Sequence, residues 1–185
     1  MHKYLKHILI YSLILIYSCT DKVKEPTNTQ QANDNKNFNT IINGFNTAIE
    51  ILRKNVKKSK KGEIQLQNPD NYKTVIDRYE QFISWIEKNP DKKKELDTDL
   101  TEAYNWLEKR RAENASEKTL AEYINDALDC KNSLCKDLKK YGTYTNQIDT
   151  FFRINSHEIF FAHNNPEDQF VKFQKINISF IKDNF

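Results

Sequence analysis

Apolar side chains recur with helical spacing over most of the chain beyond its first 37 residues. They step by three, four and seven residues, which places them on one face of a helix. The two clearest stripes are Phe38, Ile41, Ile42, Phe45, Ile49, Leu52 and Val56, and Tyr72, Val75, Ile76, Tyr79, Phe82, Ile83 and Ile86. We predict helices over 37–60 and 69–88, because Gly62 can end the first and Pro69 can open the second.

Four further helices are expected on shorter stripes toward the C-terminus. Their predicted starts are Asn89 and Pro90, Ser116, the region of Ile148, and Asn165 and Pro166. The third helix is expected to end near Glu113. Residues 176–181 alternate between apolar and polar types, so they fit either a helix or a strand. Only three glycines and four prolines are present for tight turns, and the predicted fold is all-α, a compact antiparallel bundle of five to six helices.

The first 18 residues have the pattern of an export signal. A basic start precedes an apolar run over 8–17, which is too short for the roughly 20 residues of a membrane-spanning helix. Residues 15–19, Leu-Ile-Tyr-Ser-Cys, resemble a lipobox, and Tyr17 departs from the usual small residue as in the looser form found in spirochaetes. We therefore expect lipidation of Cys19. An uncleaved apolar anchor, or an ordinary secretory signal with an incidental cysteine, is the alternative.

The segment after Cys19 has the composition of a flexible tether. Residues 20–37 contain one proline, no aromatic residue and almost no apolar ones, so they cannot bury enough surface to fold. The predicted organisation is a signal peptide over 1–18, the lipidated cysteine and tether over 19–37, and a single helical domain over 38–185. Loss of two signal-peptide lysines leaves 27 basic against 26 acidic residues. This balance gives no reason to expect a nucleic-acid partner.

Cys130 and Cys135 are five residues apart, in Cys-Lys-Asn-Ser-Leu-Cys. An unbroken helix would separate them by roughly 140° around its axis and some 8 Å along it, which is too far for a disulfide. They can pair if the helix breaks between them, and Asn132 and Ser133 favour such a break. Disulfides persist in exported proteins, so we expect a disulfide here, with two free thiols as the alternative.

The sequence offers no candidate catalytic or metal site. His157, Glu158 and His163 resemble a zinc-protease motif only superficially, because the two histidines are six residues apart rather than four. Two cysteines without a nearby histidine make half a zinc site. The sequence has no glycine-rich phosphate loop and no Gly-x-Ser-x-Gly elbow. We therefore expect no enzyme activity, no metal, no cofactor and no small-molecule substrate.

The candidate binding features are a lysine cluster and two tryptophans. The cluster comprises Lys54, Lys57, Lys58, Lys60 and Lys61, at the end of the first predicted helix. The helix dipole favours lysines there, so a solvated helix end is one interpretation, and a site for a polyanion such as a host glycosaminoglycan is the other. Trp85 and Trp106 fall off the main stripes, which fits either the edge of the core or aromatic anchors of a protein-binding surface.

Several of these features together resemble the plasmid-encoded outer-surface lipoproteins of Lyme-type spirochaetes (Borrelia). They are the lipobox ending in Cys19, the composition rich in Asn, Lys, Ile and Phe, the polar tether and the small helical domain. Within that group, the size and the stretch 67–72, Gln-Asn-Pro-Asp-Asn-Tyr, are similar to the exported plasmid proteins of the EppA/BapA type. The resemblance implies a palmitate-bearing surface antigen in the outer membrane, with host-facing binding or immune evasion and no catalysis.

Our leading hypothesis is accordingly a surface-anchored, non-catalytic module that binds a host protein or glycosaminoglycan. The membrane is its other expected partner, through the lipid anchor. An alternative of a different class is a periplasm-facing lipoprotein with a role in envelope assembly or as an immunity protein.

Overall fold

The computed structural model describes residues 35–130, 135, 137–176 and 178, which all lie in one compact unit. Every regular element in this part of the chain is a helix, which confirms the all-α prediction. Its elements are α3 (Lys36–Lys60), α4 (Pro69–Ile86), α5 (Pro90–Asp99), α6 (Thr101–Asn114), α7 (Leu120–Asp129), the 3₁₀ turn η1 (Leu138–Lys140), α8 (Gln147–Phe160) and α9 (Pro166–Gln174). The predicted signal peptide and most of the predicted tether, residues 1–34, lie outside the described residues.

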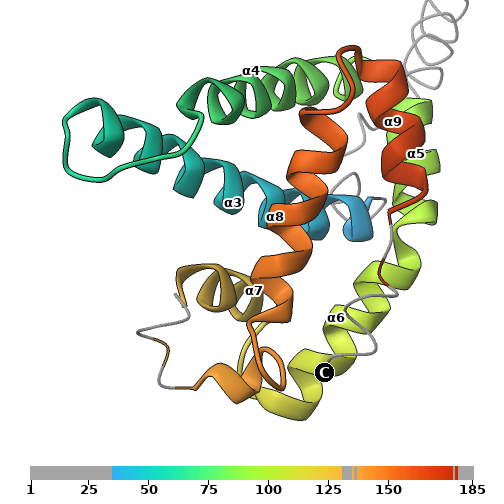
Figure 1. Cartoon of the computed structure of the whole chain (residues 1–185). Coiled ribbons are helices and arrows are strands. Elements are labelled where there is room, and N and C mark those ends of the chain that lie inside the picture. The colour runs from blue at the N-terminus through green and yellow to red at the C-terminus, as the bar shows by residue number, and fades with distance from the viewer. Residues whose placement is uncertain (1–34, 131–134, 136, 177, 179–185) are drawn as a thin grey trace, which may run out of the picture. The chain divides into compact units, whose positions relative to one another are not determined.

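Helix α3 is the central element of the bundle. It packs against α4, α5, α6, α7 and α8, and Figure 1 shows α8 crossing it while α4 runs beside it. The core where these helices meet is aromatic: the ring of Phe45 lies 5.1 Å from those of Phe152 and Phe173, and Phe82 stacks on Phe173 at 5.2 Å. All four side chains are fully buried. No helix among the described residues combines the length and the hydrophobicity that crossing a membrane would require.

The first helix begins two residues inside the predicted tether, at Lys36. Its start is held by α5 rather than by its own N-cap residue. The backbone N–H of Phe38 donates to the carboxylate of Asp97 at 2.8 Å, and the side chain of Asn37 donates to the backbone carbonyl of the same aspartate at 3.2 Å. A cap supplied by a residue 59 positions away cannot be recognised from the local sequence. This explains why the predicted boundary between the tether and the first helix was misplaced.

The third predicted helix, over 90–113, is wrong as a single element because it is two helices that meet at Leu100. The buried stripe continues across the junction through Leu96, Leu100 and Ala103, so the apolar pattern carries no sign of the break. Asn89 is at the N-cap position of α5, yet its side chain makes no capping bond there. It donates instead to the carbonyl of Trp85 at 2.7 Å and so closes the end of α4.

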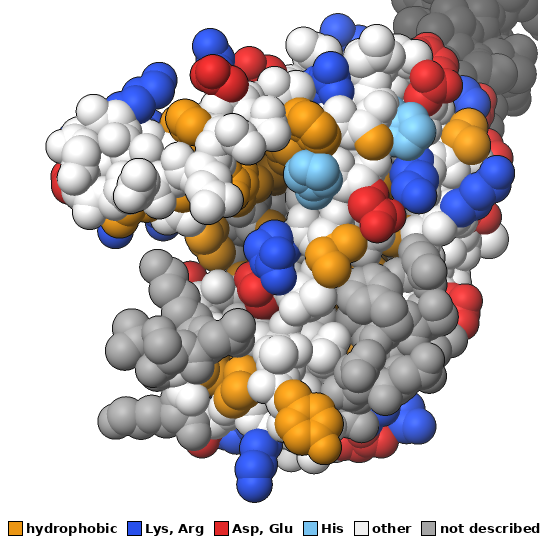
Figure 2. All heavy atoms as spheres, viewed as in Figure 1, with side chains coloured by type: hydrophobic (Ala, Val, Ile, Leu, Met, Phe, Trp, Pro, Cys, Tyr) orange, Lys and Arg blue, Asp and Glu red, His pale blue; other side chains and the backbone are white. Residues whose placement is uncertain are grey.

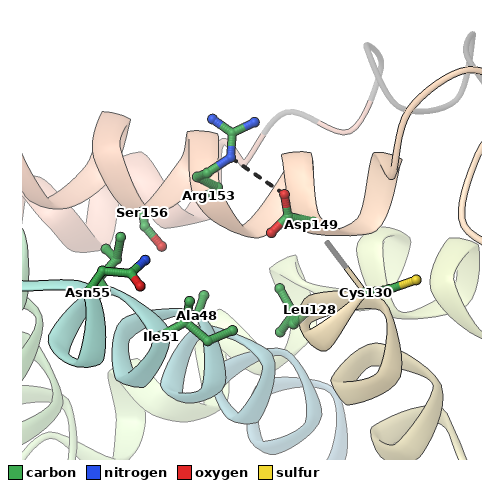
Figure 3. Close-up of a pocket in the computed structure, with 9 residues that line it drawn as sticks. Ala48, Ile51, Asn55, Leu128, Cys130, Asp149, Arg153 and Ser156 are labelled. Carbon is green, nitrogen blue, oxygen red and sulfur yellow. Dashed lines mark ion pairs between the residues drawn. The ribbon is translucent and has the colours of Figure 1, made fainter. Parts of the chain in front are cut away.

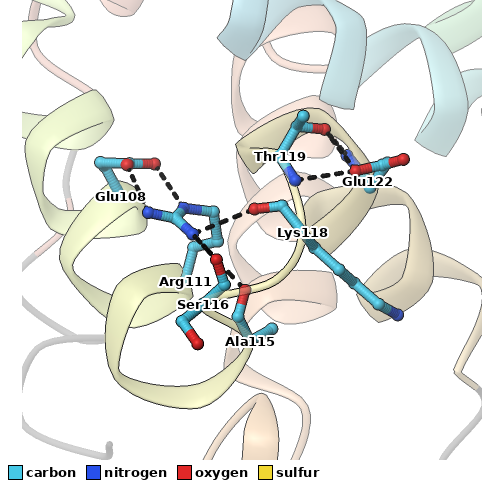
Figure 4. A network of polar contacts seen from close by, with 7 residues as sticks. All are labelled: Glu108, Arg111, Ala115, Ser116, Lys118, Thr119 and Glu122. Atoms are coloured by element: carbon cyan, nitrogen blue, oxygen red, sulfur yellow. Dashed lines mark hydrogen bonds and ion pairs between the residues drawn. The ribbon is translucent and has the colours of Figure 1, made fainter.

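Helix α7 begins after Thr119, which corrects the predicted start at Ser116. Thr119 and Glu122 form a reciprocal capping box, in which each side chain accepts a hydrogen bond from the other residue's backbone N–H. Ser116 lies in the turn between α6 and α7, and Figure 4 shows how Arg111 holds that turn. Its guanidinium pairs with Glu108 at 2.8 Å and donates to the backbone carbonyl of Ser116 at 3.1 Å.

The other helix ends follow local signals more closely. Gly62 has φ +73° and ends α3 as predicted, with the backbone N–H of Glu63 donating to the carbonyl of Lys58 at 3.0 Å. Helix α8 ends against Arg78 of α4, which donates to the carbonyl of Phe161 at 2.6 Å.

Helix α9 ends at Gln174, so the sixth helix is shorter than its apolar stripe suggests. Ile176 and Ile178 are in neither a helix nor a strand, and Ile178 is buried. Residues 177 and 179–181 lie outside the described residues, so the prediction of either a helix or a strand over 176–181 stays open.

Candidate functional site

The five lysines of the predicted cluster are all exposed, at the C-terminal end of α3. Successive residues of a helix are about 100° apart, so four of the five lie within an arc of about 100°. These four, called the lysine stripe below, are Lys54, Lys57, Lys58 and Lys61. Val56 lies on the opposite side of the helix and is buried, and Lys60 lies outside the arc. Figure 1 shows this end of α3 projecting beyond the start of α4.

The lysine stripe is poorly neutralised by the chain's own carboxylates. Arg53, one residue before it, is held by Glu50 at 2.9 Å and Glu80 at 2.7 Å. Within the stripe, Lys61 has one long contact of 3.9 Å with Glu63. The other three ammonium groups have no carboxylate of the described residues within 4.0 Å. Positive charge therefore faces the solvent on a projecting end of the molecule.

The two tryptophans are part of the packing of the core. Trp106 is buried, and Trp85 is half-buried with its ring 6.1 Å from that of Phe82 and 5.9 Å from that of Phe170. The edge-of-core interpretation is thereby confirmed. Large hydrophobic side chains exposed in the described part of the chain are Ile64, Tyr144 and Val171, which belong to three separate segments. Three exposed residues on separate segments give no indication of the continuous apolar surface that marks a protein interface.

A groove that sequence analysis missed runs along α8 where α3 faces it. It consists of two adjacent cavities of about 270 and 310 Å³. Leu52, Arg153 and Ser156 line both cavities, and we call the pair the α8 groove. Figure 3 shows the first cavity, with Ala48, Ile51 and Asn55 rising from α3 and Asp149 and Arg153 on α8. In Figure 2 the surface is hollowed between the projecting helices and the body, and hydrophobic side chains lie in the wall.

One cysteine of the predicted pair, Cys130, lines the first cavity of this groove. Helix α7 ends at Asp129, so the helix does break after it as the prediction requires, and Cys130 follows at its C-cap. The structure brings the α-carbons of Cys130 and Cys135 to 5.0 Å, a separation that a disulfide spans without backbone movement. Residues 131–134 lie outside the described residues. The disulfide itself stays a prediction, with matching geometry.

The two histidines are not placed as metal ligands. His157 is exposed on α8 and its ring stacks on Phe161 at 4.7 Å. His163 lies in the turn after α8, where its backbone carbonyl accepts from the side chain of Gln169 at 3.0 Å. Among the residues that the structure describes, no group of three or more His, Cys, Asp or Glu side chains could hold a metal ion.

Comparison with known proteins identifies the family. The model of the Mlp lipoprotein family matches residues 50–170, which are 121 of the 185 residues. The chain belongs to the Mlp lipoprotein family. A curated relative is Lipoprotein MlpJ of Borreliella burgdorferi, 29% identical over 142 residues, which cover 75% of this chain. The aligned region covers 62% of the length of that relative. No solved structure matches the chain.

Membership of the Mlp family confirms the resemblance to lipoproteins of Borrelia. The narrower EppA/BapA type is not confirmed. The matched region includes the lysine stripe, Cys130, Cys135 and every lining residue of the α8 groove except Ala48. It begins at residue 50, so the match itself does not extend to Cys19. Lipidation at Cys19 rests on the lipobox and on the family's name.

Proposed function

We propose that this Mlp protein is a non-catalytic, surface-displayed binding module, lipidated at Cys19 in the outer membrane, whose lysine stripe binds a polyanionic host macromolecule. A sulfated glycosaminoglycan is the polymer that fits this chemistry best. The observation that carries the proposal is the lysine stripe itself, exposed, on one face of α3 and largely unneutralised. Surface display and the host partner are inferences from the export signal and the family.

The geometry of the stripe suits an extended anion better than a single small one. Lys54 and Lys61 are seven residues apart, which is about 10 Å along the helix. Flexible ammonium groups at this spacing can follow the charges of a polymer, and they gain from the release of its counterions. The mature chain is close to neutral in total, so this attraction would come from the local arrangement of charge rather than from the net charge.

The affinity of the purified chain, residues 20–185, for immobilised heparin tests the proposed binding site. We expect Lys54→Gln, Lys57→Gln, Lys58→Gln and Lys61→Gln together to weaken the affinity at least about tenfold, or about 1.4 kcal/mol. A matched control removes the same charge from four exposed lysines elsewhere, Lys88, Lys94, Lys139 and Lys175. Equal loss in the two variants would contradict a specific stripe, because it would mean that only the total charge matters. Wild type should elute at higher salt than the stripe variant.

Anchoring and display need a separate experiment in the native cell. Metabolic labelling with palmitate should mark the wild type and leave Cys19→Ala unlabelled. Protease added to intact cells should cleave the labelled protein, while a subsurface lipoprotein stays uncut. A labelled but protected protein would contradict surface display and support the alternative role inside the envelope.

A further inference from the structure

The α8 groove has a single charged group with free hydrogen-bond donors at its middle. Arg153 lies between the two cavities and lines both of them. Its Nε is 3.6 Å from the carboxylate of Asp149, and its side chain is 60% exposed. The two terminal amino groups of its guanidinium donate to no residue in the described part of the chain. Since a guanidinium binds a carboxylate with two parallel hydrogen bonds, these groups form an open position for one.

The walls on either side of Arg153 are mainly apolar. On the side of α7 the first cavity has Ala48, Ile51 and Leu128, and on the side of α4 the second cavity has Tyr72 and Val75. Leu52 forms the wall that the two share. The volumes together fall within the range typical of small-ligand sites.

The length of the groove limits the size of an occupant. Its lining positions on α8 run from Asp149 to Glu158, nine residues apart and therefore about 13 Å along the helix. Arg153 lies between these two ends, so an alkyl chain whose head group is at Arg153 would extend into only one of the two cavities. A ligand of this kind would cover apolar surface on the half-buried Leu52 and Tyr72 that water now contacts, while its head group remains at the more exposed Arg153.

Asp149 is the acidic neighbour of Arg153 in the groove. The carboxylate is 33% exposed, and burial raises its pKa from the ordinary value, with Arg153 offsetting only part of that effect. One of its oxygens contacts Nε of the guanidinium, which holds that group at the groove without using its outer donors. Asp149 therefore positions Arg153 but also repels an anion bound beside it.

We infer that the α8 groove is a binding site for an amphipathic monocarboxylate, such as a medium-chain fatty acid, whose carboxylate pairs with the terminal amino groups of Arg153 and whose alkyl chain lies on Leu52 and Tyr72. This site is distinct from the lysine stripe, because no lysine of the stripe lines it and because Ala48, Leu52 and Asn55, which line it on α3, lie about 100° or more around the helix from Lys54. The inference therefore does not depend on polyanion binding.

Three probes with one chain length and different head groups test the inference by titration calorimetry. They are decanoate, decylammonium and 1-decanol, added to the mature chain 20–185 at neutral pH. We expect decanoate to bind at least about tenfold more tightly than either of the others. Arg153→Gln should remove that preference, and Asp149→Asn should strengthen decanoate binding because it removes the neighbouring negative charge. Arg53→Gln is the matched control, an arginine of α3 outside the groove, and it should leave binding unchanged.

Each contrary result overturns the inference. Tighter binding of decylammonium would show that Asp149, not Arg153, is the recognising group. Equal binding of all three probes would show a purely apolar site, and no binding up to the solubility of the probes would show that the groove takes no such ligand. If Arg153→Gln fails to fold, Leu52→Gln serves as the second variant. It places a polar amide in the wall that the two cavities share, so it should weaken the binding of decanoate and of 1-decanol alike.

Discussion

At the scale of single residues, Gly44 shows how closely the helices approach in the core. A Cβ atom at this position would lie 2.3 Å from Cζ of Phe152, which is far inside van der Waals contact. The phenyl ring is fully buried and has the rings of Phe45 and Phe151 at 5.1 and 5.0 Å, so it has no free space to enter. The crossing of α3 and α8 therefore depends on the absence of a side chain at residue 44.

The substitution Gly44→Ala is expected to lower the free energy of unfolding by about 2 kcal/mol, the usual cost of overpacking a core. Urea unfolding followed by circular dichroism measures it. Phe152→Leu in the Gly44→Ala background should recover part of the loss, because the smaller side chain makes room for the methyl group. An unchanged urea midpoint in Gly44→Ala would show that the two helices do not approach as described.

Asp149 gives a second residue-scale prediction, on the dependence of stability on pH. Burial raises the pKa of its carboxyl above 3.8, so the charged form is less favourable in the folded state than in the unfolded one. The penalty is therefore present above the folded-state pKa and disappears as the pH falls to 3.8 and below. We expect Asp149→Asn to stabilise the protein at pH 7 and to make no difference near pH 3.

Urea midpoints at the two pH values check this expectation. Asp77→Asn, at an exposed position on α4, serves as the control and should change stability little at either pH. Destabilisation by Asp149→Asn at pH 7 would mean that the contact with Arg153 outweighs the cost of burial.

At the scale of elements, apolar stripes and local caps predict the helices whose ends are fixed locally. Helix α4 begins at Pro69 as expected, and α3 ends at Lys60 before Gly62. The break at Leu100 was not predictable in this way, because the buried stripe runs through it. The start of α7 was predictable, since Thr119 and Glu122 have the spacing of a capping box, but Ser116 offered a competing cap.

The same distinction applies to the candidate sites. The lysine stripe lies on one helix and is visible in its sequence. The α8 groove depends on α3, α7 and α4 meeting α8, and its central pair, Asp149 and Arg153, has in sequence the spacing of an ordinary helical ion pair.

The corner between α7 and α8 is held by a buried asparagine. Asn146, which is buried, donates to the carbonyl of Ala127 at 2.6 Å and caps α8 by accepting from the N–H of Asp149 at 2.9 Å. We expect the disulfide of Cys130 and Cys135 to restrain the same corner. In the chain-entropy model, closing so small a loop contributes about 2 kcal/mol.

Alkylation with iodoacetamide followed by mass spectrometry tests the disulfide directly. Neither thiol of the exported protein should react until a reductant is added, and both should react afterwards. Labelling of both cysteines without reductant would show two free thiols. A double Cys130→Ser and Cys135→Ser variant should lose stability in urea and keep its helical content.

At the scale of the whole molecule, the described part is a compact helical unit whose most distinctive surface is the projecting, lysine-bearing end of α3. The two tryptophans considered as anchors for a protein partner, Trp85 and Trp106, lie in or beside the core. The mature chain is nearly neutral in total, but positive charge is concentrated at this end of α3. We therefore propose that the protein binds its partner by electrostatic contact with a polymer rather than through a large apolar interface.

Adhesion of intact cells to a heparin-coated surface tests this central claim most directly. Three isogenic strains lacking the native gene would express the wild type, the fourfold variant of the lysine stripe, or the control variant at Lys88, Lys94, Lys139 and Lys175, at equal cell-surface levels. We predict that the wild-type and control strains adhere equally and that the stripe variant loses most of the adhesion that the protein confers. Equal adhesion of all three strains would contradict the account.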